Sequence, residues 1–437
     1  MNIKRYKLIV SAFFYTSFTS LNLVQVSIAA QTTLQSNTGA SVLSECQNLP
    51  RAQGLTALQQ DLDTRCTHIA SNLNGSTGST NTNTPGLSDT ELEGALQQVA
   101  TEEASAAGTV STRTTYHQTG NIVNRLSSLR RSDKVLGGGA GDDTGEIGTG
   151  FDKASVFVNG VIGTVDKNQT DREDGFEMDS QGIIIGADYR PTSDTVVGVA
   201  LGYNRFDSDF ESNSAGSVLG GSLEADSTNL SIYGSKYMGD IYVDGVLGFG
   251  KSDYDLDRVI RYPGVDRVAK GSTDGKQFAA SIGVGMNKQQ GTITYGPYGR
   301  VHYQDIDIDG YAESGALGMN MTVNDQQIKS TKSVMGIHAS KSTSQSFGVL
   351  SPHINAEWHH EFEDDARQIS SYFTVDPNQT VFISSTDRPD RDYFTLDGGV
   401  SVVHTNGIQS FVNASVLLGQ KHIDSSYGVT AGVRVEF

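Results

Sequence analysis

The stretch "SSYGVTAGVRVEF", residues 425–437, alternates between two kinds of side chain. Every second residue is apolar, and the residues between are polar or very small. The apolar set is Tyr427, Val429, Ala431, Val433, Val435 and Phe437. Strict alternation indicates a β-strand with two different faces. Such a strand fits a sheet on a soluble core or a barrel wall with lipid outside and water inside.

The same period of two recurs along most of the chain. In "GDIYVDGVLGFGKS", residues 239–252, apolar side chains again oppose glycine and polar ones. Many successive strands of this kind, with Asp, Glu and Arg on the second face, are unusual for a soluble sheet. Twelve segments are predicted as strands: 154–165, 180–190, 194–206, 226–237, 240–252, 276–287, 291–304, 329–341, 346–362, 391–404, 407–420 and 426–437.

The gaps between these segments alternate between short and long. Two to four residues form the short turns, whereas connections such as 253–275 and 363–390 are long; the last gap, 421–425, is intermediate. Strands of about 10 to 14 residues exceed the usual 5 to 6 and suit a tilted bilayer crossing. We therefore expect a C-terminal transmembrane 12-stranded antiparallel β-barrel over residues 151–437, with both ends on the short-turn side. A soluble β-sandwich is the competing interpretation.

Composition agrees with a barrel that has a wet interior. The chain has 437 residues, of which only 36% are hydrophobic, and a net charge of -18. This acidic balance disfavours nucleic acid as a partner. Residues 1–30 carry Lys4, Arg5 and Lys7, then an apolar stretch, then small residues ending at Ala30. This order predicts a secretory signal peptide and an exported chain.

The region before the barrel is predicted to be mainly helical. Cys46 and Cys66 are expected to pair in an exported protein and to join two short helices over residues 31–110. Ser88 and Glu91 have the spacing of a capping box at the start of a further helix. Polar linkers and, over 111–150, a helix followed by a glycine-rich hinge complete the region.

Three stretches together carry a family resemblance. They are "GNIVNRLSSLR" at 120–130, "SPHINAEWHHEF" at 351–362 and "GVTAGVRVEF" at 428–437. As a set they resemble a classical monomeric autotransporter (type V secretion) over roughly residues 110–437. The resemblance implies a barrel in the Gram-negative outer membrane, inserted by the barrel assembly machinery with periplasmic chaperones, in contact with membrane lipid and lipopolysaccharide. The expected assembly signal is Tyr427, Val429, Val433, Val435 and Phe437.

The resemblance also implies that the helix before the barrel fills the pore and that residues 31–110 are a short passenger displayed at the cell surface. The basic residues of that helix, about 116–131, would then face acidic side chains of the wall. Arg125, Arg130 and Arg131 are the candidate cations, and Asp244, Glu357 and Glu361 are the candidate lumenal acids. A periplasmic helix with solvated charges is the alternative.

Self-cleavage in such a helix uses asparagine in part of the family. Asn121 and Asn124 are not adjacent, so we expect the passenger to stay attached. No cofactor is implied by the sequence.

No catalytic or metal-binding motif stands out. The chain lacks G-x-S-x-G and H-E-x-x-H. "HHEFEDDAR", from His359 to Arg367, groups histidine with carboxylates, but His359 and Glu361 are expected to point into the lumen. We expect no enzymatic activity. The alternatives are an outer-membrane barrel enzyme (protease or acyl hydrolase) with a site on its loops, or a plain pore or adhesin whose N-terminal region stays in the periplasm.

Overall fold

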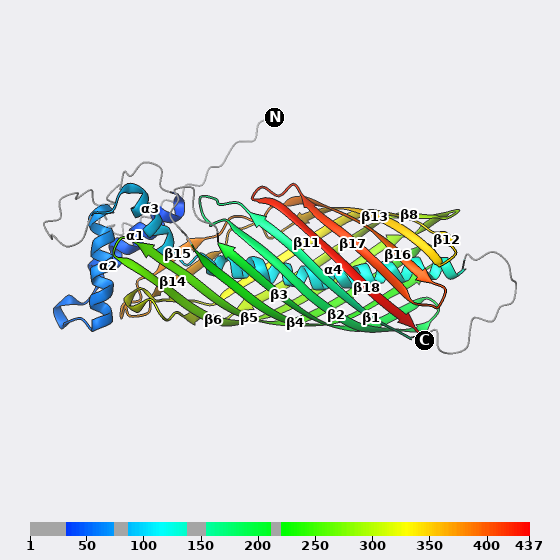
Figure 1. The fold of residues 1–437 in the computed structure, drawn as a ribbon, viewed down its shortest axis with the longest axis horizontal. Helices are drawn as coiled ribbons and strands as arrows, with labels where there is room; N and C mark the ends of the chain where they lie inside the picture. Colours follow the sequence, from blue (N-terminus) through cyan, green and yellow to red (C-terminus); the bar gives the residue numbers. More distant parts are fainter. Residues whose placement is uncertain (1–31, 74–85, 138–153, 211–219) are drawn as a thin grey trace, which may run out of the picture.

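The computed structural model describes residues 32–73, 86–137, 154–210 and 220–437, with backbone only for residues 131–137. The predicted signal peptide, the centre of the first polar linker and nearly all of the glycine-rich hinge lie outside these ranges. The described chain forms a long barrel with a helix inside it and a group of helices at one end (Figure 1).

The helical elements come first in the chain. They are α1 (Thr33–Asn48), η1 (Arg51–Gln53), α2 (Ala57–Leu73), α3 (Asp89–Val99) and α4 (Glu103–Gly137), with η2 (Leu317–Met319) much later. The strands are β1 (Ala154–Lys167), β2 (Phe176–Thr192), β3 (Thr195–Phe210), β4 (Gly221–Met238), β5 (Ile241–Tyr262), β6 (Val265–Met286), β7 (Lys288–Gln290), β8 (Ile293–Ile308), β9 (Tyr311–Ala312), β10 (Met321–Val323), β11 (Gln326–Lys341), β12 (Thr343–Gln345), β13 (Gly348–Glu361), β14 (Gln368–Phe373), β15 (Phe382–Ser385), β16 (Asp392–His404), β17 (Gln409–Leu418) and β18 (Ile423–Glu436).

Twelve long antiparallel strands close into a barrel, as the sequence predicts. The order runs from β1 through β6 to β8, then β11, β13, β16, β17 and β18, and β18 returns to β1. Closure joins the two ends of the barrel sequence directly, because Ala154 and Phe437 exchange both backbone hydrogen bonds, at 3.0 and 3.3 Å. No edge strand is left open in this wall, which is the condition for a sheet in lipid.

The outer parts of the long connections differ from the prediction. Residues 253–275, expected as a loop, instead continue β5 and β6 as a paired hairpin that turns at Pro263 and Gly264. One face of this hairpin, with Tyr254, Leu256 and Ile260, is buried. The acidic residues between these positions make the stretch resemble an exposed acidic loop, which is why the sequence did not predict a strand here. Two of the other long connections, 305–328 and 363–390, contribute a separate four-stranded sheet in the order β15-β14-β10-β9.

The helices begin where the sequence supplies capping groups. The Ser88 hydroxyl accepts a hydrogen bond from the Glu91 backbone N–H, and the Glu91 carboxylate accepts one from the Ser88 backbone N–H. This confirms the predicted capping box. Thr32 and Gln35 do the same for α1. Among the described helices, none is both long enough and apolar enough to cross a membrane.

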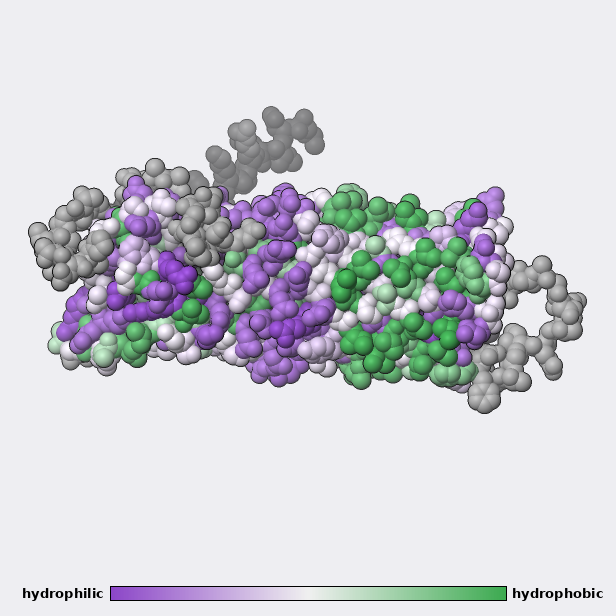
Figure 2. All heavy atoms as spheres, in the orientation of Figure 1, coloured by the Kyte–Doolittle hydropathy of each residue, from purple (hydrophilic) through white to green (hydrophobic). Residues whose placement is uncertain are grey.

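On the face drawn in Figure 2, an apolar belt covers the half of the barrel nearest the chain's C-terminus, and a polar band lies beyond it. Ile162, Ile282 and Ile337 point outward in this belt and are 60–65% exposed. A continuous exposed apolar surface of this kind marks contact with a membrane. The belt therefore fixes which half of the barrel lies in lipid and which half projects beyond it.

Candidate functional site

Helix α4 runs along the inside of the barrel, from the end that carries α1–α3 toward the end that carries the C-terminus (Figure 1). We call α4 the plug. Its C-terminal half presents Ile122, Leu126 and Leu129, all fully buried, to apolar side chains of the wall. The opposing wall residues are Phe157, Ile184, Val196, Ala200, Tyr233 and Val246. This stripe at helical spacing gives the plug an apolar seat inside an otherwise polar lumen.

A buried ion pair fixes the middle of the plug to the wall. The Arg125 guanidinium donates to both carboxylate oxygens of Asp188 on β2, with the Nη2–Oδ2 distance 2.7 Å, and to the Ser155 hydroxyl at 2.9 Å. The same guanidinium stacks over the Phe157 ring at 4.8 Å. Both charged side chains are more than nine-tenths buried, so each depends on the other for compensation.

A second ion pair repeats this arrangement near the C-terminal end of the plug. Arg130 donates to both oxygens of Asp244 at 2.7 and 2.9 Å, and the Ser235 hydroxyl donates to Asp244 at 2.6 Å. The Tyr242 ring lies 3.8 Å below the Arg130 guanidinium. Arg125 and Arg130 thus bind different acids on neighbouring parts of the wall; the side chain of Arg131 lies outside the described residues.

The other two candidate acids have cations of their own. Glu357 binds Arg300 of β8 at 3.0 Å and accepts from the Tyr298 hydroxyl, and Glu361 lies 3.7 Å from Lys332 of β11. The ion partners observed for these two acids belong to the wall, and a contact with the plug arginines stays a prediction because the side chain of Arg131 is outside the described residues. The sequence pointed to Asp244 correctly but missed Asp188, which looks like any other alternating polar residue.

The histidine and asparagine candidates also lie inside the barrel. His359 is fully buried, with its Nε2 3.2 Å from Glu357 and its ring stacked on Tyr393 at 4.7 Å. Asn121 donates to the carbonyl of His117 one turn earlier in the plug. Within the described part of the chain, no group of three or more His, Cys, Asp or Glu side chains could hold a metal ion.

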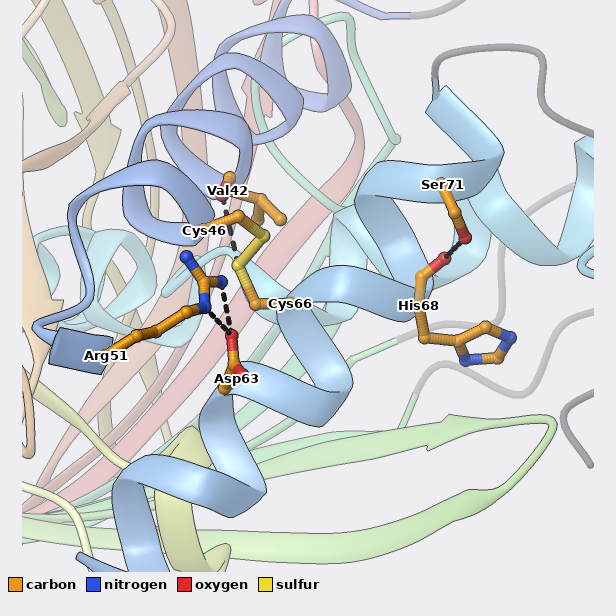
Figure 3. Close-up of a disulfide and its surroundings, with 7 residues drawn as sticks. All are labelled: Val42, Cys46, Arg51, Asp63, Cys66, His68 and Ser71. Carbon is orange, nitrogen blue, oxygen red and sulfur yellow. Dashed lines mark hydrogen bonds and ion pairs between the residues drawn. A yellow bond between two sulfur atoms is a disulfide. The ribbon is translucent and has the colours of Figure 1, made fainter. Parts of the chain in front are cut away.

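Helices α1, α2 and α3 form what we call the cap, at the barrel end that carries the long connections (Figure 1). The predicted disulfide is present: Cys46 of α1 and Cys66 of α2 are joined, with Cα atoms 5.6 Å apart (Figure 3). Arg51 and Asp63 form an ion pair beside it. The bridge staples two short helices that are too small to stabilise themselves by burial alone.

The cap and the barrel share one apolar core. From the cap it contains residues such as Leu62, Ile69 and Leu96, and from the barrel the ends of β5 and β6 and the small four-stranded sheet. The barrel members are Ile260, Tyr262, Val265, Ala269, Ala316, Met319, Met321, Phe373 and Phe382. Because neither side could bury this surface alone, the cap is packed as part of the barrel's outer end.

One arginine of the wall holds the junction between α3 and the barrel. Arg258 of β5 is 2% exposed and binds Glu313 with Nε–Oε1 at 2.9 Å. It also donates to the carbonyl of Gln98 in α3 at 2.8 Å and to that of Met319 at 3.0 Å. These bonds satisfy carbonyl groups at a buried helix end that have no partner within the helix. Arg258 therefore ties cap, strand and loop together.

Two further contacts fix α2. Arg267 of β6 binds both carboxylate oxygens of Asp61 at 2.6 Å. Gly318 of η2 lies so close to α2 that an added Cβ would come within 2.4 Å of the Leu58 carbonyl oxygen and 2.6 Å of the Leu62 nitrogen. Only glycine permits this approach of backbone to backbone.

Buried carboxyl groups lie inside the cap and at its base. Glu45 of α1 is fully buried, and this burial, together with the nearby Asp376 carboxylate, raises its pKa to about 8. Between α3 and the plug, Glu102 lies against Asp174, whose backbone donates to it at 2.5 Å. Burial and the Asp174 charge raise the pKa of Glu102. Sequence reasoning found none of these groups, because their partners come from distant loops.

Comparison with known proteins agrees with this architecture. Residues 156–415, more than half of the chain, match the family described as autotransporter β-domain. The chain is 25% identical over 270 residues, 58% of its length, to Esterase EstA of Pseudomonas aeruginosa and equally to that of Pseudomonas putida; the match spans 36% of each esterase. The translocator domain of the autotransporter NalP from Neisseria meningitidis superposes with a TM-score of 0.52 at 17% identity, covering 73% of this chain and 98% of that domain.

Proposed function

Because this chain belongs to the autotransporter β-domain family, we propose that its barrel exports the N-terminal region and keeps it outside as a docked cap. The position of that region carries the proposal. The cap lies at the barrel end with the long connections, and the plug passes from it through the lumen toward the end with the short turns, where β1 begins. A chain can reach this arrangement by threading its N-terminal part through the barrel.

The barrel itself lies in the outer membrane, as its family and its apolar belt indicate. Tyr427 and Val433 of β18 face outward in this belt, being 58% and 48% exposed, and Phe437 pairs with the start of β1. We propose that the barrel assembly machinery reads this terminal pattern, after periplasmic chaperones have delivered the chain. Lipopolysaccharide is the proposed lipid partner of the outer part of the wall.

We propose that the cap stays attached and docked. Its support is the shared apolar core and the buried Arg258–Glu313 pair, which together make undocking expensive. A displayed passenger that acts at a distance needs few contacts with its own barrel. Here the exported region is short, and nearly every apolar side chain it buries faces either its own helices or the barrel's outer end.

We further propose that the chain is not an esterase, although two relatives carry that name. The match spans only 36% of those proteins. The sequence has no G-x-S-x-G, the strained turn that exposes a nucleophilic serine in many acyl hydrolases. Purified protein should hydrolyse p-nitrophenyl butyrate no faster than a heat-denatured sample, and turnover that survives purification would overturn this part of the proposal.

An epitope test distinguishes export from periplasmic retention. An epitope is inserted after Gly54, whose positive φ of 79° and open surroundings mark an exposed turn of the cap. A control carries the same epitope at Gly239, in the short turn between β4 and β5. We expect intact cells to stain only with the first insertion and permeabilised cells to stain with both. Staining of the Gly54 insertion only after permeabilisation would place the cap in the periplasm and reject the proposal.

A further inference from the structure

The plug does not fill the barrel evenly. It packs mainly against β3, β4, β5, β6 and β8. On the other side, between the plug and the wall of β16, β17, β18 and β1, lies a cavity of about 530 Å³. This is within the range of pockets that hold small ligands.

Small side chains keep this cavity open. Gly163 of β1, Gly428 of β18 and Ser415 of β17 line one side, and Gly120 of the plug lines the other. A Cβ built on Gly120 would find no atom within 4 Å. The open space therefore results from small residues on both the wall and the plug, and not from the rotamer of a single side chain.

The cavity opens at the outer rim beside the cap. Asp390, Gln420 and Ile423 belong to its lining, whereas none of the described residues of α1, α2 or α3 does. The described cap helices therefore form no part of the cavity wall.

Several charges in the lining compensate one another. Glu357 is bound by Arg300, Glu361 lies 3.7 Å from Lys332, and Glu173 lies 3.3 Å from Lys167. Acids at the rim, including Glu363, Asp365 and Asp390, lie where water can reach them. These groups make the cavity wall polar. Two further cations of the lining take part in none of these ion pairs.

Those cations are Arg113 of the plug and Arg367 of the β13–β14 connection. Arg113 donates to the Ser426 hydroxyl at 3.2 Å, and Arg367 donates to the Gln326 side-chain oxygen at 3.2 Å and the Ser105 carbonyl at 3.4 Å. Within the described part of the chain, no carboxylate lies within 4 Å of either guanidinium, Asp397 of the same lining included. The nearby Glu173 carboxylate partly compensates Arg367, whereas only neutral hydroxyl groups lie near Arg113. A cation in such a place favours an anion beside it.

The two guanidinium groups line the same cavity at different levels of the plug. Arg367 packs against Gly108, where an added Cβ would meet it at 2.4 Å. Gly108 precedes Arg113 by five residues, which gives about 7.5 Å of helical rise and about 140° of rotation, so the two arginines approach different faces of the plug. Near the same level the lining is apolar, with Val165, Met178 and Ile328. We propose that this cavity binds a small organic anion, its carboxylate at Arg113 and its apolar body against these three side chains.

Calorimetry on the full-length, detergent-solubilised protein tests the proposal, with empty micelles as the blank. Hexanoate is the probe, and hexanamide is its neutral isostere. We expect hexanoate to bind at least tenfold more tightly than hexanamide, and Arg113→Gln to weaken hexanoate at least tenfold without affecting hexanamide. Arg205→Gln is the matched control, because Arg205 lies on β3 in a surface pair with Glu224, outside the cavity lining.

Arg367→Gln provides a second, independent test should Arg113→Gln fail to fold, as judged by heat-modifiable migration. It should weaken hexanoate binding in the same direction. Equal binding of hexanoate and hexanamide, no binding of hexanoate, or affinity unchanged by the folded arginine variants would each overturn the proposal. Surface display of the Gly54 epitope is expected to be normal in both variants, so failure of anion binding leaves the export proposal standing.

Discussion

The plug and the cap are both N-terminal helices held by the same barrel, yet different forces hold them. The plug is fixed by two buried ion pairs, Arg125–Asp188 and Arg130–Asp244, to regular strands of the wall. The cap is fixed mainly by an apolar core that it shares with the barrel's outer end, and a disulfide links two of its own helices. In the polar lumen, matched charges hold the plug. At the outer end of the barrel, exclusion of water from an apolar core holds the cap. The two attachments should therefore be separable by mutation.

Reversing a plug charge should have the largest effect. Arg125→Glu places a carboxylate against Asp188 in a site from which water is excluded, and breaking a buried pair costs about 3–5 kcal/mol before the new repulsion is added. We expect the plug to leave its seat and conductance in planar bilayers to rise several-fold, while cap residues stay protease-resistant. Conductance equal to that of the unmodified protein would show that the pair does not hold the plug.

The matched control exchanges the two charges of the pair. Arg125→Glu combined with Asp188→Arg should return conductance most of the way to the original level, because the two charges again compensate each other. Arg205→Glu, on the outside of the wall, should leave conductance unchanged. If the double variant conducts as much as the single one, loss of packing and not loss of charge explains the effect.

Removing Arg258, the wall arginine that binds the cap, should release the cap and leave the plug in place. Arg258→Ala leaves Glu313 buried without its cation and frees the carbonyls of Gln98 and Met319, for a cost of about 3–5 kcal/mol. We expect trypsin to cleave the cap on intact cells at least tenfold faster, with unchanged heat-modifiable migration of the barrel. Arg261→Ala, three residues along and in a surface pair with Asp266, should change cleavage little. Equal effects of the two substitutions would contradict the role of Arg258.

The same contrast explains what the sequence could and could not predict. The twelve strands, the disulfide, the capping box at Ser88 and the acid Asp244 followed from local period and spacing. The cap's docking did not, because its partners, Arg258 and Glu313, lie in segments expected to be loops. Their roles depend on contacts between residues far apart in the chain, such as the 160 positions between Gln98 and Arg258. The pairing of Glu357 with Arg300 was missed for the same reason: the two charges lie on β13 and β8, which are separated by β11.

Opening the disulfide should destabilise the cap alone. Joint Cys46→Ala and Cys66→Ala substitution removes a link across 20 residues, worth about 3 kcal/mol. We expect the cap to unfold at lower temperature while the barrel keeps its heat-modifiable migration and the Gly54 epitope stays at the surface. A matched pair, Ser71→Ala and Ser44→Ala, removes two hydroxyls from the same helices and should have little effect. Loss of barrel assembly in the cysteine variant would mean that cap and barrel do not fold separately.

The smallest expected effect is a dependence of cap docking on pH. Glu45 has a pKa of about 8 in the folded cap, well above the ordinary value of 4.5, because the buried carboxyl is favoured in its neutral form. A folded pKa raised in this way means that the folded state binds the proton more tightly than the unfolded state. Its contribution is therefore complete below about pH 4.5 and is lost as pH rises toward 8. The Glu102–Asp174 pair, whose carboxyls also have raised pKa values, acts in the same direction.

We therefore expect trypsin to cleave the cap several-fold faster at pH 8.5 than at pH 6.5, after correction for the pH dependence of trypsin on an unfolded substrate. Glu45→Gln keeps the neutral shape at every pH and should flatten this dependence, though not abolish it, because Glu102 and Asp174 remain. Glu93→Gln, in α3, is the control. A pH dependence of equal steepness in the Glu45→Gln and unmodified proteins would show that Glu45 does not link cap docking to proton binding.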